Sequence, residues 1–122
     1  MVAIYKEVVM ADCLFCKIVS GDIPTNKIYE ADKVLAFGDI NPQAPVHILI
    51  IPKKHIKSLD EVSQEDISLL GHIQLVASKI AKEKKLVDGY RLVNNCGVDG
   101  GQTVAHIHYH LLGGRTFGWP PG

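Results

Sequence analysis

Three histidines near the C-terminal end of the chain, His106, His108 and His110, are spaced two residues apart and alternate with apolar residues. On a β-strand this spacing puts the three imidazoles on one face, whereas a helix, at about 100° per residue, would scatter them. The pattern therefore predicts a strand over residues 106–112 with one face lined by histidines. Because histidine can act as a nucleophile, acid, base or metal ligand near neutral pH, we interpret this face as a functional site.

Other elements follow from capping residues and hydrophobic periodicity. Asp12 is the expected N-cap of a short helix over residues 13–19, and Gly21 would end that helix in a left-handed conformation. Ser63 and Asp66 have capping-box spacing and open a long helix that ends near Lys85. Short β-prone runs predict four more strands, at 27–30, 34–37, 46–51 and 90–94. Five strands with mostly short connections, and helices segregated to one side, predict the α+β class with an antiparallel sheet.

The long predicted helix carries an apolar stripe that is wider than one sheet face usually requires. The residues at helical spacing are Ile67, Leu70, Ile73, Ala77 and Ile80. The residues that broaden the stripe are Leu69, Val76 and Ala81. Two interpretations fit equally well: the extra width contacts a partner subunit, or it is the broad core-facing surface of a small protein.

Charge and cysteine content exclude several classes of partner. Thirteen Lys and Arg balance thirteen Asp and Glu, so no broad basic field exists to attract nucleic acid or an anionic membrane. Three cysteines fit a reducing compartment better than a disulfide framework. The longest apolar run, residues 48–51, is far shorter than the roughly 20 residues that span a bilayer. We expect a cytoplasmic protein with no nucleic-acid or membrane partner.

Length predicts one folded unit. A chain of 122 residues usually forms a single domain, since domains run to about 100–200 residues. We assign that domain to residues 12–122, with a C-terminal tail over 113–122. Residues 1–11 are expected to be an N-terminal extension and a candidate for disorder.

A glycine-rich loop precedes the histidines and ends in Gly101, Gln102 and Thr103. Glycines let backbone amides approach a ligand closely, so such a loop can cradle phosphate oxygens, with the two polar side chains as further donors. The loop lacks the Lys-Ser/Thr ending of a Walker loop. Taken alone it could equally be a hairpin loop, but beside three histidines it predicts a phosphate site.

Residues 106–112 resemble the His-φ-His-φ-His-φ-φ signature of the histidine triad superfamily. Residues 39–45, 47–55, 99–102 and 113–115, together with the terminal Trp119-Pro120-Pro121-Gly122, look like its Hint branch, the histidine triad nucleotide-binding proteins. The resemblance covers residues 12–122. It implies a five-stranded antiparallel sheet in each subunit and a homodimer that joins two such sheets.

The resemblance also implies a reaction. The middle histidine, His108, would attack the α-phosphorus of a nucleotide and form a nucleotidyl-imidazole intermediate that water hydrolyses. His110 would hold a phosphate oxygen, and His106 and His47 would complete the histidine network around the nucleophile. The chemistry itself would need no cofactor.

Further positions match the family's nucleotide contacts. Asp39 resembles the ligand of the ribose hydroxyls. The apolar cleft for the base would be formed by Ile23, Phe37 and Ile40. The polar contacts to the phosphate would be Asn95, Gly101, Gln102 and Thr103. Trp119 in the tail would lie near the leaving group.

Cys13 and Cys16 have the spacing of a zinc knuckle, but no second close cysteine pair follows. Many bacterial members of the superfamily complete such a pair with the histidine after the Ile-Pro strand and the first histidine of the triad, here His55 and His106. Four nitrogen and sulfur ligands would close the shell, so the expected zinc is structural.

The leading expectation is hydrolysis of the P–N bond of purine nucleoside 5′-phosphoramidates, with AMP as product and a purine nucleotide as the substrate class. One alternative is a dinucleoside polyphosphate hydrolase, and another is a nucleotide-binding adaptor with incidental hydrolysis. A third is a zinc hydrolase in which all three triad histidines bind one metal that activates water.

Overall fold

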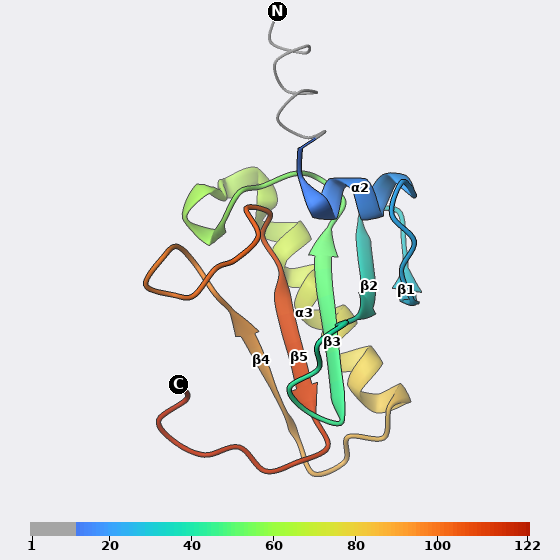
Figure 1. Cartoon of the computed structure of the whole chain (residues 1–122), viewed down its shortest axis with the longest axis vertical. Helices are drawn as coiled ribbons and strands as arrows, with labels where there is room; N and C mark the ends of the chain where they lie inside the picture. The colour runs from blue at the N-terminus through green and yellow to red at the C-terminus, as the bar shows by residue number, and fades with distance from the viewer. Residues whose placement is uncertain (1–11) are drawn as a thin grey trace, which may run out of the picture.

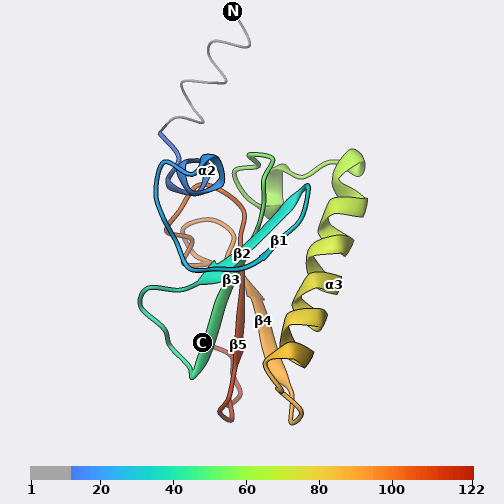
Figure 2. The ribbon, with the colours of Figure 1, turned by 90° about the vertical axis from the view of Figure 1, so that its right-hand side faces the viewer.

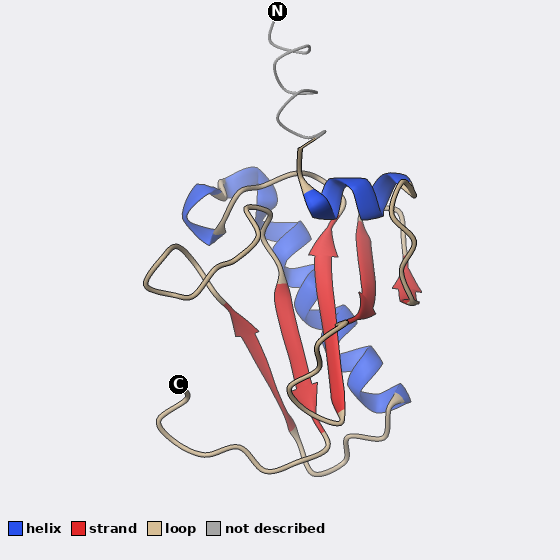
Figure 3. Ribbon diagram, viewed as in Figure 1, coloured by secondary structure: helices blue, strands red, loops and turns tan. Residues whose placement is uncertain are grey.

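The computed structural model describes residues 12–122, so the predicted extension at 1–11 lies outside the described part of the chain. The helices, 3₁₀ turns and strands in chain order are α2 (Leu14–Ser20), β1 (Lys27–Glu30), β2 (Val34–Gly38), β3 (Val46–Pro52), η1 (Leu59–Glu61), η2 (Gln64–Asp66), α3 (Ile67–Glu83), β4 (Tyr90–Asn94) and β5 (Tyr109–Gly113). These elements confirm the predicted α+β class (Figure 3).

All five strands form one antiparallel sheet in the order β1-β2-β3-β5-β4 (Figure 1). The central pair sets Ile48 opposite Leu111 and Leu49 opposite His110. Strand β5 lies between β3 and β4, so the last of the three histidines is in the middle of the sheet.

The two faces of the sheet have separate cores. Helix α3 covers one face, whereas α2 lies on the opposite side at one end of the strands (Figure 2). The prediction that the helices lie on one side of the sheet is therefore wrong, because apolar residues on both faces need to be covered. The α3 side is packed by alternate strand residues such as Ile50, Ile107 and Leu111. The α2 side is packed by Phe15 of α2 and by the strand residues that alternate with the first set, Leu35, Phe37, Leu49 and Ile51.

The structure confirms three of the four capping residues predicted from the sequence, namely Gly21, Ser63 and Asp66, and contradicts Asp12. Gly21 ends α2 with φ 88°, the left-handed conformation that favours glycine. Ser63 and Asp66 form the predicted capping box, although a 3₁₀ turn precedes α3, which begins only at Ile67. The predicted Asp12 cap is wrong: the N-cap is Cys13, whose Sγ accepts a hydrogen bond from the Cys16 amide at 3.4 Å.

The predicted strand over 106–112 is shorter than expected. Strand β5 begins at Tyr109, because that is the first of its residues that pairs with a neighbouring strand. Tyr109 lies opposite Ile50 of β3 and Asn94 of β4, and neither pairing extends further upstream in β5. The alternation nevertheless continues upstream, since Ile107 is buried in the α3 core while His106 and His108 are buried away from it. The histidine face is therefore real, but only one of its three members lies in the ladder.

The wide apolar stripe of α3 is largely used within the chain. Val76 and Ala81, two of the residues that broaden it, are buried, as are Ile73, Ala77 and Ile80. Ile67 and Leu75 remain 66% and 56% exposed. The core-facing interpretation accounts for most of the stripe. In residues 12–122 no helix is both long and apolar enough to cross a membrane.

Candidate functional site

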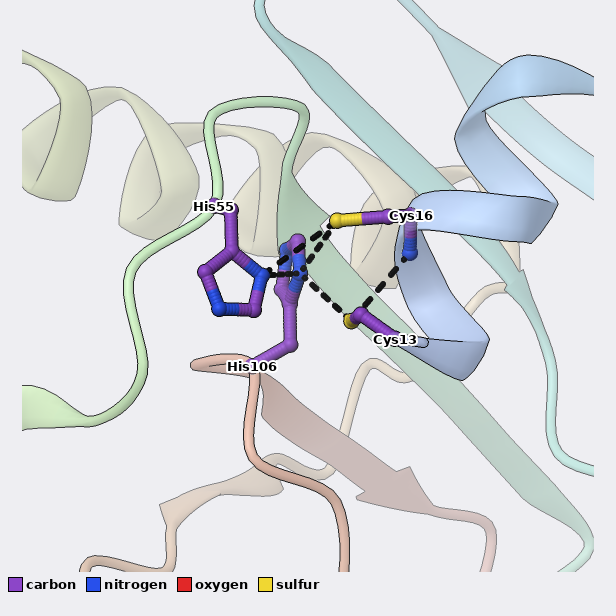
Figure 4. Close-up of side chains that lie close together, drawn as sticks. All are labelled: Cys13, Cys16, His55 and His106. Carbon is purple, nitrogen blue, oxygen red and sulfur yellow. Dashed lines mark hydrogen bonds between the residues drawn. The ribbon is translucent and has the colours of Figure 1, made fainter. Parts of the chain in front are cut away.

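Four side chains from distant parts of the chain converge beside the N-terminus of α2 (Figure 4). Cys13 and Cys16 come from α2, His55 follows β3, and His106 precedes β5. The Sγ atoms of Cys13 and Cys16 lie 3.3 and 3.6 Å from His106 Nδ1. His55 Nδ1 lies 3.3 Å from Cys16 Sγ and 3.2 Å from His106 Nδ1.

These separations fit the edges of a zinc tetrahedron. Zn–S bonds of about 2.3 Å and Zn–N bonds of about 2.0–2.1 Å give edges of roughly 3.6 Å between S and N and 3.3 Å between two N atoms. The Nε2–H of His106 donates to the Pro52 carbonyl at 2.9 Å, so its Nδ1 presents a lone pair to the other three ligands. The residues therefore fit a closed, four-ligand site.

Burial favours the neutral forms of Cys16, His55 and His106 in the absence of a cation. It raises the pKa of the Cys16 thiol to about 12, with the neighbouring Cys13 adding to the shift, and it lowers the pKa of His106 to about 4. A bound divalent cation reverses this preference for thiols, because a coordinating thiol loses its proton. The four groups are thus paired best by a metal ion.

His108 is held in one tautomer by its own backbone. Its Nδ1–H donates to the His106 carbonyl at 2.8 Å, which leaves the lone pair on Nε2. The ring is buried, and Phe15 of α2 meets it edge-on at 5.0 Å. The carbonyl of His108 accepts a hydrogen bond from Asn94 Nδ2 at 2.9 Å, which fixes the backbone as well.

A second chain of hydrogen bonds orients His110. The Gln43 amide donates to His47 Nδ1 at 3.0 Å, so the hydrogen of neutral His47 is on Nε2 and is donated to His110 Nδ1 at 2.8 Å. The remaining N–H of His110 is then on Nε2, available to an anion. Asp39 Oδ2 lies 3.4 Å from His47 Nε2. Burial, and then the neighbouring His108 and His47, lower the pKa of His110 to about 4, so the ring is neutral near pH 7.

The predicted base-binding residues lie in different environments. Phe37 is buried in the α2-side core, where its ring meets Phe15 at 5.7 Å, and Ile23 packs against the same core. Ile40 is fully exposed beyond β2, and Trp119 is 85% exposed in the tail. Asp39 Oδ1 accepts the Asn41 amide at 2.7 Å, which braces the turn.

The glycine-rich loop is bonded mainly to itself. The amides of Gly101 and Gln102 donate to the carbonyls of Val98 and Gly97, each at 3.0 Å. The Gln102 side chain accepts from the Gly97 amide and donates to two carbonyls, while Asn95 Nδ2 donates to the Gly100 carbonyl. Thr103 makes no such bond among the described residues. Its amide and hydroxyl are therefore among the loop donors left for a phosphate, together with the amides of Val98, Asp99 and Gly100.

A cavity of about 400 Å³ lies beside this network, on the sheet face opposite α3. His47, His110 and Asn95 line one part of it, and the tail residues Phe117, Gly118 and 120–122 line another, whereas Trp119 does not line it. Arg91 of β4 and Arg115 of the tail also line it. The sequence analysis gave neither arginine a role. Arg91 and Asn95 are an even number of residues apart, so strand alternation could have placed those two side chains on the same face of the sheet.

The family follows from comparison with known proteins. Residues 12–116 match the family model described as "Scavenger mRNA decapping enzyme C-term binding". An uncharacterized HIT-like protein of Synechococcus elongatus is 53% identical over 111 residues, which cover 91% of this chain and 97% of that protein. A 14 kDa zinc-binding protein of Zea mays is 52% identical, over 89% of this chain and 87% of its own.

Solved structures agree with this placement. The crystal structure of a HIT family hydrolase from Legionella pneumophila has a TM-score of 0.89 at 54% identity and covers 91% of this chain and 100% of its own. A histidine triad protein from Clostridium difficile has a TM-score of 0.85 at 53% identity, with 88% and 94% covered. The chain therefore belongs to the histidine triad (HIT) superfamily, and within it resembles the hydrolases.

Proposed function

We propose that the protein hydrolyses the P–N bond of purine nucleoside 5′-phosphoramidates, releasing AMP and an amine. The observation that carries this proposal is the fixed tautomer of His108, whose Nδ1–H is committed to the His106 carbonyl at 2.8 Å. A neutral imidazole with a free lone pair is the form that attacks phosphorus. His110, with one N–H unused, provides a donor from a ring centred 5.2 Å from that of His108.

The reaction proceeds in two displacements. In the first, His108 Nε2 forms a bond to the α-phosphorus while the P–N bond to the amine breaks and the amine nitrogen gains a proton. In the second, water attacks the same phosphorus and releases a proton that balances the one taken up by the amine, the P–Nε2 bond breaks, and neutral His108 is restored. The His110 Nε2–H stabilises charge on a phosphate oxygen during both steps; deletion of one such donor elsewhere costs about 2.7–4 kcal/mol.

Nucleotide positioning is assigned to the residues that match the family. Asp39 accepts hydrogen bonds from the ribose hydroxyls, as an ionised carboxylate can accept two. Ile23, Phe37 and Ile40 form the wall against the base. The polar set Asn95, Gly101, Gln102 and Thr103 surrounds the phosphate, with Thr103 as the direct donor, and Trp119 adjoins the leaving group.

Zinc is proposed as a structural component held by Cys13, Cys16, His55 and His106. The fit of the four ligand atoms supports it, and so does the similarity to a maize protein named for zinc binding. These four residues would hold the ion and leave it no open position for water, and the bound ion would help to fix His106, whose carbonyl accepts from His108. Hydrolysis then needs no metal-bound water.

The three-histidine zinc hydrolase is not favoured by the geometry. The Nδ1 atoms of His106, His108 and His110 face the cysteines, a backbone carbonyl and His47, respectively. Neither of the two groups in residues 12–122 that could hold a metal ion includes His108. The triad therefore does not converge on a single metal.

We propose a homodimer in the cytoplasm, with residues 12–122 as its folded domain. Strand β4 lies at the edge of the sheet, and Tyr90 on it is 43% exposed. Leu75 on the adjacent α3 is 56% exposed. An edge strand beside exposed apolar side chains is a surface that a second copy can extend.

The test is AMP release from adenosine 5′-phosphoramidate by wild-type protein, His108→Asn and His72→Asn. His72 on α3 is the one histidine of the chain that belongs neither to the triad nor to the two groups that contain His47 and His55, so it controls for the substitution itself. We expect His108→Asn to lose activity by about 10⁴-fold or more and His72→Asn to retain it. Equal activity in the three proteins would reject His108 as the nucleophile, and release of no AMP by any of them would favour the nucleotide-binding adaptor.

A further inference from the structure

The cavity beside His110 contains both arginines of the chain, and the proposed reaction leaves them without a role. Its lining includes no aspartate or glutamate side chain; Asp39 contacts His47 but does not line the cavity. Since burial lowers the pKa of His47 and of His110, the positive charge on this wall comes from Arg91 and Arg115. Gly122 also lines the cavity, but its carboxylate forms no ion pair with either arginine.

Neither arginine is neutralised within the described chain. The ion pairs in residues 12–122 involve lysines and His47, and none includes Arg91 or Arg115. Arg91 makes one hydrogen bond, from Nη2 to the Gly118 carbonyl at 2.8 Å. Arg115 donates to the Gln43 and Thr116 carbonyls at 3.2–3.3 Å. Because a guanidinium has five N–H groups, several donors remain on each.

Phe117 contacts both of these like charges. The guanidinium carbons of Arg91 and Arg115 lie 5.1 and 4.2 Å from the centre of its ring. Cation–π contacts and carbonyl acceptors fix both groups without neutralising them. Because both arginines line the same cavity, an anion bound there would gain charged donors and offset the two like charges.

From this arrangement we propose that Arg91 and Arg115 form a subsite for an anionic group on the leaving amine. This inference rests on the proposed function, because the cavity adjoins His110 at the phosphate end of the site. The preferred substrates would then be adenosine 5′-phosphoramidates whose amine carries a carboxylate or a phosphate. An amino acid joined to AMP through its amine nitrogen has this chemistry.

The test compares leaving groups of matched size and different charge. Adenosine 5′-phosphoramidates of glycine and of 2-aminoethyl phosphate are compared with that of neutral glycinamide and with unsubstituted adenosine 5′-phosphoramidate. We expect kcat/KM for at least one anionic substrate to exceed that for glycinamide by roughly fivefold, the size expected of a partly exposed ion pair. The anion that shows the preference identifies the ligand as a carboxylate or a phosphate.

Variants assign the preference to the arginines. Arg91→Gln and Arg115→Gln together should bring the ratio of kcat/KM for the anionic substrate to that for the neutral one to about one. Arg91→Lys and Arg115→Lys should keep part of the preference because the charge remains. Lys79→Gln removes an exposed cation from α3 and should leave the ratio unchanged. A wild-type ratio near one for both anions, or a preference that survives both glutamine changes, would overturn the proposal.

A binding measurement separates this inference from the proposed hydrolysis. His108→Asn protein is titrated calorimetrically with the glycine, aminoethyl phosphate and glycinamide substrates, with and without the two glutamine changes. Tighter binding of an anion that depends on the arginines supports the subsite even if no turnover is found. Equal affinity for the three ligands, beside intact hydrolysis of unsubstituted phosphoramidate in wild-type protein, rejects the subsite alone.

Discussion

At the scale of single residues, tautomers decide what the histidines can do. Backbone groups set two of them: the His106 carbonyl accepts from His108, and the Gln43 amide donates to His47. His47 then sets His110 through a 2.8 Å hydrogen bond. His108 and His110 each commit Nδ1 to a hydrogen bond, and their Nε2 atoms make none among the described residues, whereas both nitrogens of His47 are bonded. Similar side chains are thereby suited to different roles.

The titration of His110 tests this network. Burial and the neighbouring histidines place its pKa at about 4, below the ordinary value of 6.5. We expect its ring resonances, assigned by comparison with His110→Gln, to titrate with a midpoint near pH 4. Since the unfolded chain takes up this proton first as pH falls, the contribution of His110 to stability is present above about pH 6.5 and is lost between there and pH 4. A midpoint near 6.5 would contradict the buried network.

At the scale of elements, α2 with its N-cap carries two of the proposed zinc ligands and also a contact to the proposed nucleophile. Phe15 is 4% exposed, and its ring meets those of His106 and His108 at 5.8 and 5.0 Å. The position of this short helix therefore affects both sites.

Two glycines provide a matched test of how α2 ends. Gly21 has φ 88°, whereas Gly71 lies within α3, and a Cβ at either would meet nothing within 4 Å. Gly21→Ala should destabilise the fold by about 1 kcal/mol through backbone strain alone. Gly71→Ala should stabilise it by about 0.5–1 kcal/mol. Denaturant unfolding measures both, and the same sign for the two changes would show that the local backbone is described wrongly.

At the scale of the whole molecule, the four-ligand cluster joins α2 to the segments that follow β3 and precede β5. We expect one zinc per chain by elemental analysis, and a loss of stability of about 3–4 kcal/mol on chelation if free zinc had been at 100–1,000 times its dissociation constant. Cys16→Ser should lose the metal. Cys96→Ser, a change of the one cysteine outside the cluster, should keep it. Zinc retained equally by both variants would contradict the assignment.

Much of this architecture was predictable because alternation and capping are local properties. The five strands and both predicted helices follow from residue patterns, and the histidine face follows from a period of two. The start of β5 could not be predicted in this way, because it depends on where β3 and β4 stop pairing with it. Phe15, Arg91 and Arg115 were missed because their significance comes from tertiary contacts with His108, the tail and Phe117.

The central claim is that His108, and no metal-bound water, attacks phosphorus. Rapid mixing of the protein with adenosine 5′-phosphoramidate, with and without a strong zinc chelator, followed by mass spectrometry, tests it directly. The account predicts a transient nucleotidyl adduct on His108 that survives brief chelation and is absent from His108→Asn. AMP release that stops on chelation while the fold persists, with no adduct on His108, would contradict it.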